Sequence, residues 1–242
     1  KKDLEEMYSM IEVIVQENSG MGAANNVGIG LCKTDYAFVI NPDVKFYDNT
    51  LKEMINFSSN NDDYCILAPI LDDIRFPNYK IKNKEIANND IDYLSVDSVD
   101  GFAMLINKNK FKDNIYFDEN FFLYLENDDL CLRKKNENNI IYVLKKAKIN
   151  HLGGKSHSVI YEKEIEYSRN WHWMWSKFYF NKKYYGYFIA FKETFPIMIS
   201  SIIKFIYYLI IFNKFKRHVY FMRISGILNS MLGKKSWYRP EV

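Results

Sequence analysis

The sequence predicts an α/β domain followed by a helical region, and both the apolar pattern and the charge distribution indicate this division. In the first part of the chain, short runs of β-branched and aromatic residues alternate with segments of helical spacing. Residues 184–212 are nearly all apolar or aromatic. From Lys177 onward, twelve Lys and Arg residues stand against two Glu residues, a net charge of +10, whereas the first 176 residues carry −7. We therefore expect an α/β domain over residues 1–158 and a basic, aromatic-rich helical region over residues 159–242.

The composition excludes two classes of protein. Apolar residues make up 48% of the 242 residues and charged residues 26%, which is too apolar for a disordered chain. The cysteines, Cys32, Cys65 and Cys131, are odd in number, far apart and without a CxxC spacing. They argue against a disulfide framework or a zinc site and fit a reducing compartment.

Each element of the α/β domain has its own signal in the sequence. Short buried runs predict strands at residues 11–15, 36–40, 64–69, 96–106, 140–143 and 147–149. Helices are expected at residues 23–32, after Thr50 as N-cap with Glu53 in a capping box, and from near Glu126. Residues 72–95 are polar and rich in Asn, and predict a loop. In such an alternation, the functional site is expected beyond the carboxyl edge of the sheet.

The apolar C-terminal segment predicts a helix at a membrane surface. Pro196 suits the first turn of a helix over residues 197–212, which is interrupted by Lys204. That stretch is shorter than the roughly 20 residues needed to cross a bilayer. Because lysines flank it on both sides, we expect it to lie in the interface, with a buried helical appendage and a true span as alternatives.

Two acidic motifs could take part in chemistry. Asn41-Pro42-Asp43 follows a predicted strand, and a carboxylate there could hold Mg²⁺ or Mn²⁺ against a phosphate, although Asx-Pro is also typical of a simple turn. Glu126, Asp128 and Asp129 follow an aromatic run. They would either complement the dipole of a helix that starts there or provide a general base whose pKa is raised in an apolar pocket.

A histidine and a glycine-rich segment are the remaining candidates. His151 precedes a GGKS string that lacks the first glycine of a phosphate loop, because Ile149 stands there, so nucleotide hydrolysis is excluded. His151 follows a predicted strand and could direct a ring nitrogen to the same cation as Asp43. The glycines of residues 18–28 would let the backbone approach a ligand, and Asn26 could bond a sugar or base edge.

Taken in order, these motifs resemble those of the inverting family 2 glycosyltransferases of GT-A fold, close to the rhamnosyltransferase-like enzymes of bacterial surface polysaccharide assembly. The matching strings are NSGMGAANNVGI (18–29), VINPDV (39–44), VDGFAMLI (99–106), FDENFFLYLENDDLCLR (117–133) and HLGGKS (151–156). The resemblance covers roughly residues 11–158, and the string at 117–133 is the most specific.

The resemblance implies roles for individual residues. Asp43 would hold a Mg²⁺ or Mn²⁺ ion that bridges the donor diphosphate, with His151 as a second contact. Many relatives carry Asp or Glu where Asn127 stands, and an amide cannot accept a proton, so Glu126 would be the base, with Asp129 or Asp128 as its alternatives. The residues expected to bind the donor or line its sugar pocket are Asn18, Gly20, Asn26, Asn41, Asp43, Asp100 and Gly101.

The resemblance also implies a reaction and a location. A nucleotide-sugar donor would give its sugar to a glycan or lipid-linked glycan at the cytoplasmic face of the cell membrane, where the protein would be peripheral. Nucleic acid is not an expected partner, because the basic residues are interleaved with apolar runs.

The start of the chain suggests an alternative. Relatives open with a strand, a helix and a strand before the segment that matches residues 11–15, so we expect a GT-A sheet that is N-terminally incomplete. Asn127 and the missing strands favour a competing function, a truncated membrane-surface binding or scaffold module with weak or no catalysis.

Overall fold

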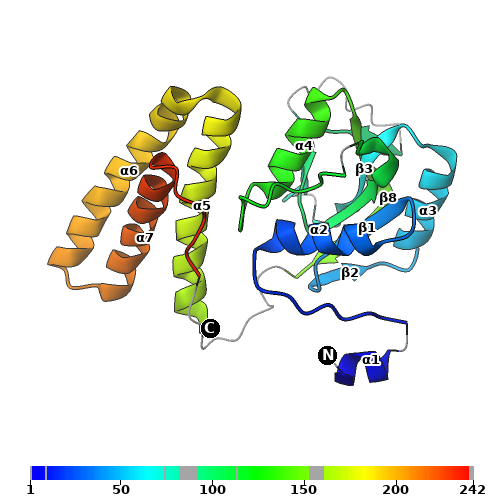
Figure 1. Cartoon of the computed structure of the whole chain (residues 1–242), viewed down its shortest axis with the longest axis horizontal. Coiled ribbons are helices and arrows are strands. Elements are labelled where there is room, and N and C mark those ends of the chain that lie inside the picture. Colours follow the sequence, from blue (N-terminus) through cyan, green and yellow to red (C-terminus); the bar gives the residue numbers. More distant parts are fainter. Residues whose placement is uncertain are drawn as a thin grey trace.

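The structure is a computed structural model that describes residues 2–8, 10–73, 75–81, 92–112, 114–152 and 161–239. It contains a mixed α/β domain and, after it, three long helices (Figure 1). The expected boundary at residue 158 and the GGKS string from residue 153 lie outside the described residues.

The α/β domain is built on a mixed sheet in the order β1-β7-β3-β8-β2, with β5 paired to β8 as well. Its strands are β1 (Tyr36–Ile40), β2 (Val44–Phe46), β3 (Tyr64–Leu71), β5 (Tyr93–Ser95), β7 (Ala103–Asn107) and β8 (Ile140–His151). The pair β3–β8 is parallel, whereas β1–β7, β3–β7, β2–β8 and β5–β8 are antiparallel. A separate two-stranded sheet joins β4 (Tyr79–Lys80) to β6 (Ser98–Val99).

Helices cover both faces of the sheet, because successive strand side chains point to opposite sides. Ile66 belongs to a core shared with α2 (Met21–Leu31) and α4 (Glu126–Asn136), while its neighbour Leu67 belongs to a second core under α3 (Thr50–Asn60). A short helix, α1 (Lys2–Met7), precedes them. This arrangement places the first turns of α2 and α4 on the same face of the sheet.

The predicted strand at residues 11–15 is wrong. Residues 11–20 form no strand, and Val15 is 77% exposed. A β-branched run forms a stable strand only when it pairs with a neighbour and buries one face. Here β1 is an edge of the sheet, and no described segment pairs along its outer side.

The segment around Gly101 also differs from the prediction. The single strand expected at residues 96–106 is divided into β6 and β7 by a turn at residues 100–102, because the two halves pair with different partners. Strands β4 and β5 lie within the expected loop at residues 72–95. Residues 82–91 of that loop lie outside the described residues.

The bounds of one strand and the start of one helix also differ from the prediction. The two strands expected at residues 140–149 are one strand, β8, which remains continuous across an irregularity in its pairing with β3. Thr50 is the first helical residue of α3 and not its cap, which is Asn49. The buried Thr50 hydroxyl instead donates a hydrogen bond to the carbonyl oxygen of Lys148 on β8.

The three C-terminal helices are α5 (Glu162–Tyr185), α6 (Tyr187–Ile210) and α7 (Lys214–Met231). In Figure 1, α5 lies between the α/β domain and the other two helices. Helices α5 and α7 approach closely at Gly226, where an added Cβ would lie 2.3 Å from the carbonyl oxygen of Trp171. The side chains of Trp171, Trp175 and Met222 form the core between α5 and α7.

The apolar helix is longer than predicted. It begins at Tyr187, ten residues before the expected start, and Pro196 lies inside it. A proline removes one backbone hydrogen bond, but packing against neighbouring helices can hold both halves in line. At 24 residues, α6 is the one described helix that is long and apolar enough to cross a membrane, and 11% of its apolar window is buried. Its length therefore no longer excludes a span.

Candidate active site

Asp43 and His151 lie together at the end of the sheet. Asp43 follows β1 after a short turn, and the antiparallel pairing of β2 with β8 places Val44 opposite His151. The Nε2 atom of His151 is 3.3 Å from Oδ1 of Asp43, and both side chains are mostly buried. The backbone N–H of Leu152 donates to the carbonyl oxygen of Asp43 and fixes the two segments. The sequence had predicted that these two residues share a site.

The turn at residues 100–102 lies against this pair. The Phe102 ring stacks on His151, with centroids 4.1 Å apart and planes 20° apart. The backbone N–H of Asn41 donates to the Phe102 carbonyl oxygen over 2.9 Å. Asn41 thus contributes its backbone to the site, and Phe102 holds the orientation of the imidazole ring.

Gly101 joins this turn to the first turn of α4. A Cβ added to Gly101 would lie 3.3 Å from the Cβ of Asn127 and 3.3 Å from the terminal methyl of Met21. The Asn127 amide donates to the carbonyl oxygen of Val99 over 2.8 Å. The Asn127 amide therefore has a structural partner, and it brings α4 against the turn.

Two further acids border the turn. Both oxygens of Asp128 accept hydrogen bonds from Nζ of Lys80, each over 2.8 Å. Asp100 is held by its backbone N–H, which donates to the carbonyl oxygen of Asn78. Burial raises the pKa of Asp100, and the charge of Lys80 acts in the opposite direction. Nothing in the sequence indicated Lys80, because a lysine in a polar loop carries no distinctive signal.

Glu126, the first residue of α4, has a buried carboxyl group. The residue is 3% exposed, and its Oε2 atom has no hydrogen-bond partner among the described residues. Burial raises the pKa of Glu126 to about 7; a hydrogen bond from its own backbone N–H acts against this, and the charge of Asp128 adds to it. A Cβ on Gly22 would lie 3.8 Å from the Cβ of Glu126, so the first turn of α2 forms one wall around it.

The backbone before Glu126 is strained. Tyr124 and Leu125 have φ angles of 71° and 68°, a left-handed conformation that non-glycine residues adopt at a cost. Contacts to α5 hold them there: Tyr124 packs edge-on against Trp173 at 5.4 Å, and the Ser176 hydroxyl donates to the carbonyl oxygen of Leu123. Such strain is often found at functional sites.

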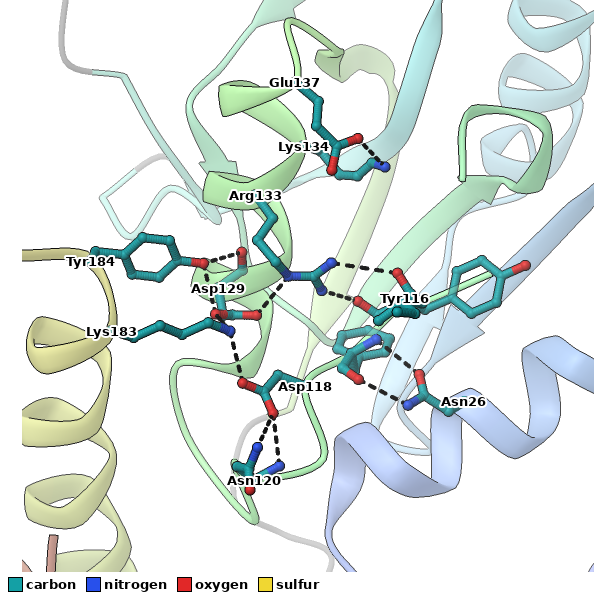
Figure 2. A network of polar contacts seen from close by, with 12 residues as sticks. Asn26, Tyr116, Asp118, Asn120, Asp129, Arg133, Lys134, Glu137, Lys183 and Tyr184 are labelled. Atoms are coloured by element: carbon teal, nitrogen blue, oxygen red, sulfur yellow. Dashed lines mark hydrogen bonds and ion pairs between the residues drawn. The ribbon is translucent and has the colours of Figure 1, made fainter. Parts of the chain in front are cut away.

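Asp129 lies one turn away in a different environment (Figure 2). It is 0% exposed and bonds Arg133 over 3.0 Å, Lys183 over 2.5 Å and the Tyr184 hydroxyl over 2.7 Å. Lys183 also contacts Asp118 over 2.7 Å. Asp129 therefore joins α4 to α5 and is surrounded by cations.

The glycine-rich segment at residues 18–22 supports the same region. Gly20 has a φ of 102°, and a Cβ there would lie 2.5 Å from the carbonyl oxygen of Phe122. Its N–H donates to the side chain of Asn18, and the N–H of Met21 donates to the Phe122 carbonyl. Gly20 is thus required for the close approach of α2 to the segment before Glu126.

The side-chain amide of Asn26 forms hydrogen bonds within the protein. Its Nδ2 donates to the Phe117 carbonyl and to Glu119, each over 2.9 Å, and its Oδ1 accepts from the Phe117 N–H (Figure 2). In the structure Asn26 anchors the segment that leads to Glu126, and its role in donor binding remains a prediction.

Two cavities lie near these residues. The larger, about 800 Å³, adjoins the network of Figure 2 and is lined by Asn26, Asp118, Arg133 and Lys183, away from the Asp43–His151 pair. The smaller, about 530 Å³, begins at Lys80 and Asp128 and is lined on its apolar side by Leu125, Leu132, Phe180 and Tyr185. The second cavity shares Lys80 and Asp128 with the surroundings of the turn, and neither cavity is lined by Asp43, His151 or Glu126.

The α/β architecture agrees with a comparison against known families. No curated protein matches the chain. The family model of glycosyl transferase family 2 matches residues 2–133, which is more than half of the chain and includes Asp43, Gly101 and Glu126. The mixed sheet with its covering helices is consistent with a GT-A domain. The chain therefore belongs to glycosyl transferase family 2.

Proposed function

We propose that this glycosyltransferase moves a sugar from a nucleoside diphosphate to an acceptor hydroxyl with inversion, and that Glu126 is its general base. The observation that carries this proposal is the buried Glu126 carboxyl, with an unpartnered Oε2 and a pKa of about 7. Asp128 is paired with Lys80, and Asp129 with Arg133 and Lys183. Of the three acids, Glu126 is the one without a cationic partner among the described residues.

The proposed reaction is one displacement. The acceptor oxygen attacks the anomeric carbon from the side opposite the leaving group and forms the new C–O bond. The bond from that carbon to the diphosphate oxygen breaks, and its electron pair departs with the nucleoside diphosphate. The hydroxyl proton passes to Glu126, whose pKa near neutral pH suits this transfer, and such a base typically contributes about 10²–10⁴ in rate.

Asp43 and His151 fit a divalent cation. A carboxylate oxygen and an imidazole nitrogen 3.3 Å apart suit Mn²⁺ or Mg²⁺. No group of three or more His, Cys, Asp or Glu residues gathers within the described ranges. Two protein ligands leave positions open for phosphate oxygens and water, as is usual for Mg²⁺ at phosphate sites. A bound ion would neutralise charge that develops on the leaving diphosphate.

The acceptor is proposed to be a lipid-linked glycan. The 530 Å³ cavity presents polar groups at Lys80 and Asp128 and apolar side chains at Phe180 and Tyr185, the last turns of α5. The apolar α6 follows directly, with Phe188 87% exposed. These features support a peripheral location at a membrane surface, and the sequence resemblance suggests its cytoplasmic face and a rhamnosyl or another hexosyl donor.

Replacing Glu126 tests the assignment of the base. Glu126→Gln keeps the side-chain volume but cannot accept a proton. We therefore expect nucleoside diphosphate release and product formation to be abolished. Binding of donor nucleotides with Mn²⁺, measured by calorimetry over a panel of nucleotide sugars, should remain. Glu162→Gln, an exposed acid on α5, should retain turnover. Near-normal turnover of Glu126→Gln would overturn the proposal.

A second function is favoured by Asn127, whose amide stands where relatives are expected to carry an acid. In that case the protein is a membrane-surface binding module that holds a nucleotide sugar or glycan without transferring it. The same calorimetry, followed by product detection, decides between the two functions. Donor binding by the unaltered chain with no product from any donor supports the binding module.

A further inference from the structure

Helix α6 exposes an apolar stripe, interrupted by Lys192, on the side away from α5 and α7. Phe188, Phe195, Ile199, Ile203 and Ile210 follow one another at helical spacing and are 39–87% exposed. The buried residues of α6 are small: Ala190, Thr194 and Ser201. An apolar stripe in a region of net charge +10 is suited to the surface of an anionic bilayer.

A polar cavity lies beside this stripe, between α6 and α7. It measures about 390 Å³, within the range of ligand pockets. It is lined by Pro196, Ile197, Ser200, Ser201 and Lys204 from α6 and by Tyr220 and Arg223 from α7. The lining contains two cationic side chains, two serine hydroxyls and a tyrosine, and no acid.

The two cations of this cavity are incompletely paired. Arg223 donates from Nη1 to Oδ1 of Asn170 over 3.2 Å, but its Nε is buried and has no hydrogen-bond partner among the described residues. Lys204 has no carboxylate within ion-pair distance in the described part of the chain, and its Nζ lies 5.4 Å from the Tyr220 ring. Neither cation has a carboxylate partner in the described part of the chain, so this cavity is suited to an anion that accepts hydrogen bonds.

We propose that the α6–α7 cavity binds the phosphate group of an anionic phospholipid while the apolar stripe of α6 enters the acyl region. Lys204 and Arg223 supply charge and N–H donors, and guanidinium groups match phosphate geometry well. The inference rests on the proposed membrane location of α6, but not on catalysis. A loss of transfer in Glu126→Gln therefore leaves it unaffected.

Vesicle binding by the full chain tests the cavity with a matched pair of variants. Lys204→Gln and Lys192→Gln remove the same charge from α6, but Lys192 lies on the stripe face and does not line the cavity, so its loss reports general attraction to the bilayer surface. With vesicles of phosphatidylcholine and phosphatidylglycerol, we expect Lys204→Gln to lose at least tenfold more affinity than Lys192→Gln. Adding Arg223→Gln to Lys204→Gln should deepen the loss more than adding Lys214→Gln to Lys192→Gln does, since Lys214 contributes only surface charge.

Two further experiments test whether the bound phosphate group belongs to a lipid. With phosphatidylcholine vesicles that carry an equal negative charge as oleate, whose carboxylate replaces the anionic phosphate, the two single variants should bind equally. Millimolar inorganic diphosphate should compete for the unaltered chain on phosphatidylglycerol vesicles and have no effect on Lys204→Gln.

Three outcomes would overturn the proposal. An equal loss for both variants on phosphatidylglycerol would show that only general surface charge attracts the chain. Inorganic diphosphate bound through Lys204, with vesicle binding unchanged by the substitution, would assign the cavity to a soluble phosphate. Binding of RNA that is abolished by Lys204→Gln, without an effect on vesicles, would assign it to nucleic acid. Lys204 is exposed, so its replacement leaves the helical core intact and the comparison stands even if Arg223→Gln fails to fold.

Discussion

Glu126 and Asp129 lie one turn apart on α4, yet their surroundings give them opposite properties. Burial without a cation raises the pKa of Glu126 to about 7. Asp129 is equally buried but forms ion pairs with Arg133 and Lys183. A carboxyl with a raised pKa is suited to proton transfer, whereas a carboxylate paired with cations from two helices is suited to holding those helices together.

The raised pKa of Glu126 predicts a pH-dependent stability. The folded chain favours the protonated carboxyl, so its contribution is complete below pH 4.5 and is lost as the pH rises through about 7. Glu126→Gln stays neutral, and we expect it to raise the free energy of unfolding at pH 8 by on the order of 2–3 kcal/mol. At pH 4 the two proteins should be equally stable in urea denaturation. A variant that is less stable at pH 8 would contradict this assignment.

Individual residues were predictable from the sequence where a motif surrounded them. Asp43 and His151 were expected to converge, because each follows a predicted strand, and they are 3.3 Å apart. The bond from Lys80 to Asp128 and the bonds of the Asn26 amide to the segment at Phe117 were not predictable. Both depend on which segment lies opposite in space, and no spacing within the chain encodes that.

At the scale of elements, α4 and α5 are joined by a buried ionic network. Asp129, Lys183 and Asp118 connect the two helices (Figure 2). Burial acts to raise the pKa of Asp118, but hydrogen bonds from Lys183 and Asn120 outweigh it, and the pKa lies below its usual value. The same helix α5 holds the strained backbone before Glu126, so this contact also positions the proposed base.

Removing the central carboxylate should loosen this contact. Asp129→Asn leaves Arg133 and Lys183 without their buried partner, and we expect the free energy of unfolding to fall by on the order of 3–5 kcal/mol. Asp128→Asn, which loses an ion pair with the exposed Lys80, should cost less than about 1 kcal/mol. Equal effects in chemical denaturation would show that the buried network contributes no more than the exposed pair.

The C-terminal segment is joined to α5 by a neutral histidine. Nε2 of His172 donates to the Tyr238 carbonyl, and Nδ1 accepts from the Ser236 hydroxyl, each over 2.9 Å. Burial lowers the pKa of His172 to about 4; the bond to Tyr238 acts against this, and the charge of Arg239 adds to it.

This histidine predicts an acid-sensitive contact. The stabilisation is present above pH 6.5 and falls as the pH drops toward 4, by on the order of 3 kcal/mol in total. Tryptophan fluorescence, to which Trp171 beside His172 contributes, should report loosening of the helices over this range. His172→Gln should flatten the acid dependence, and an unchanged profile in that variant would contradict the assignment.

For the molecule as a whole, the division into an α/β domain and a basic helical region determines where it can act. The sheet and the site occupy one side, and α6 with its apolar stripe lies on the far side of α5 (Figure 1). Helices α5 and α7 share a tryptophan-rich core, so deleting the C-terminal helices would expose apolar surface of α5. Substitution on the stripe is therefore a cleaner test of membrane association than truncation.

Phe188→Glu combined with Ile203→Glu should weaken vesicle association. Burying each of these side chains is worth about 1.5–3 kcal/mol, so the pair should lower affinity by more than about tenfold. Leu51→Glu with Ile55→Glu makes the same change on exposed positions of α3 in the α/β domain and should leave sedimentation with vesicles unchanged. Equal effects of the two pairs would show that α6 is not the membrane-binding element.

The sequence by itself determined the α/β class, the charged and apolar C-terminal region, the start of α4 at Glu126 and the acids that could act. These properties depend on local periodicity and on residue type, which a single chain displays directly. Tertiary structure decided that residues 11–15 form no strand, that the segment at residues 96–106 is divided by a turn and that α6 continues through Pro196. It also distinguished Glu126 from Asp129, because burial and the choice of partner arise only when distant segments pack together.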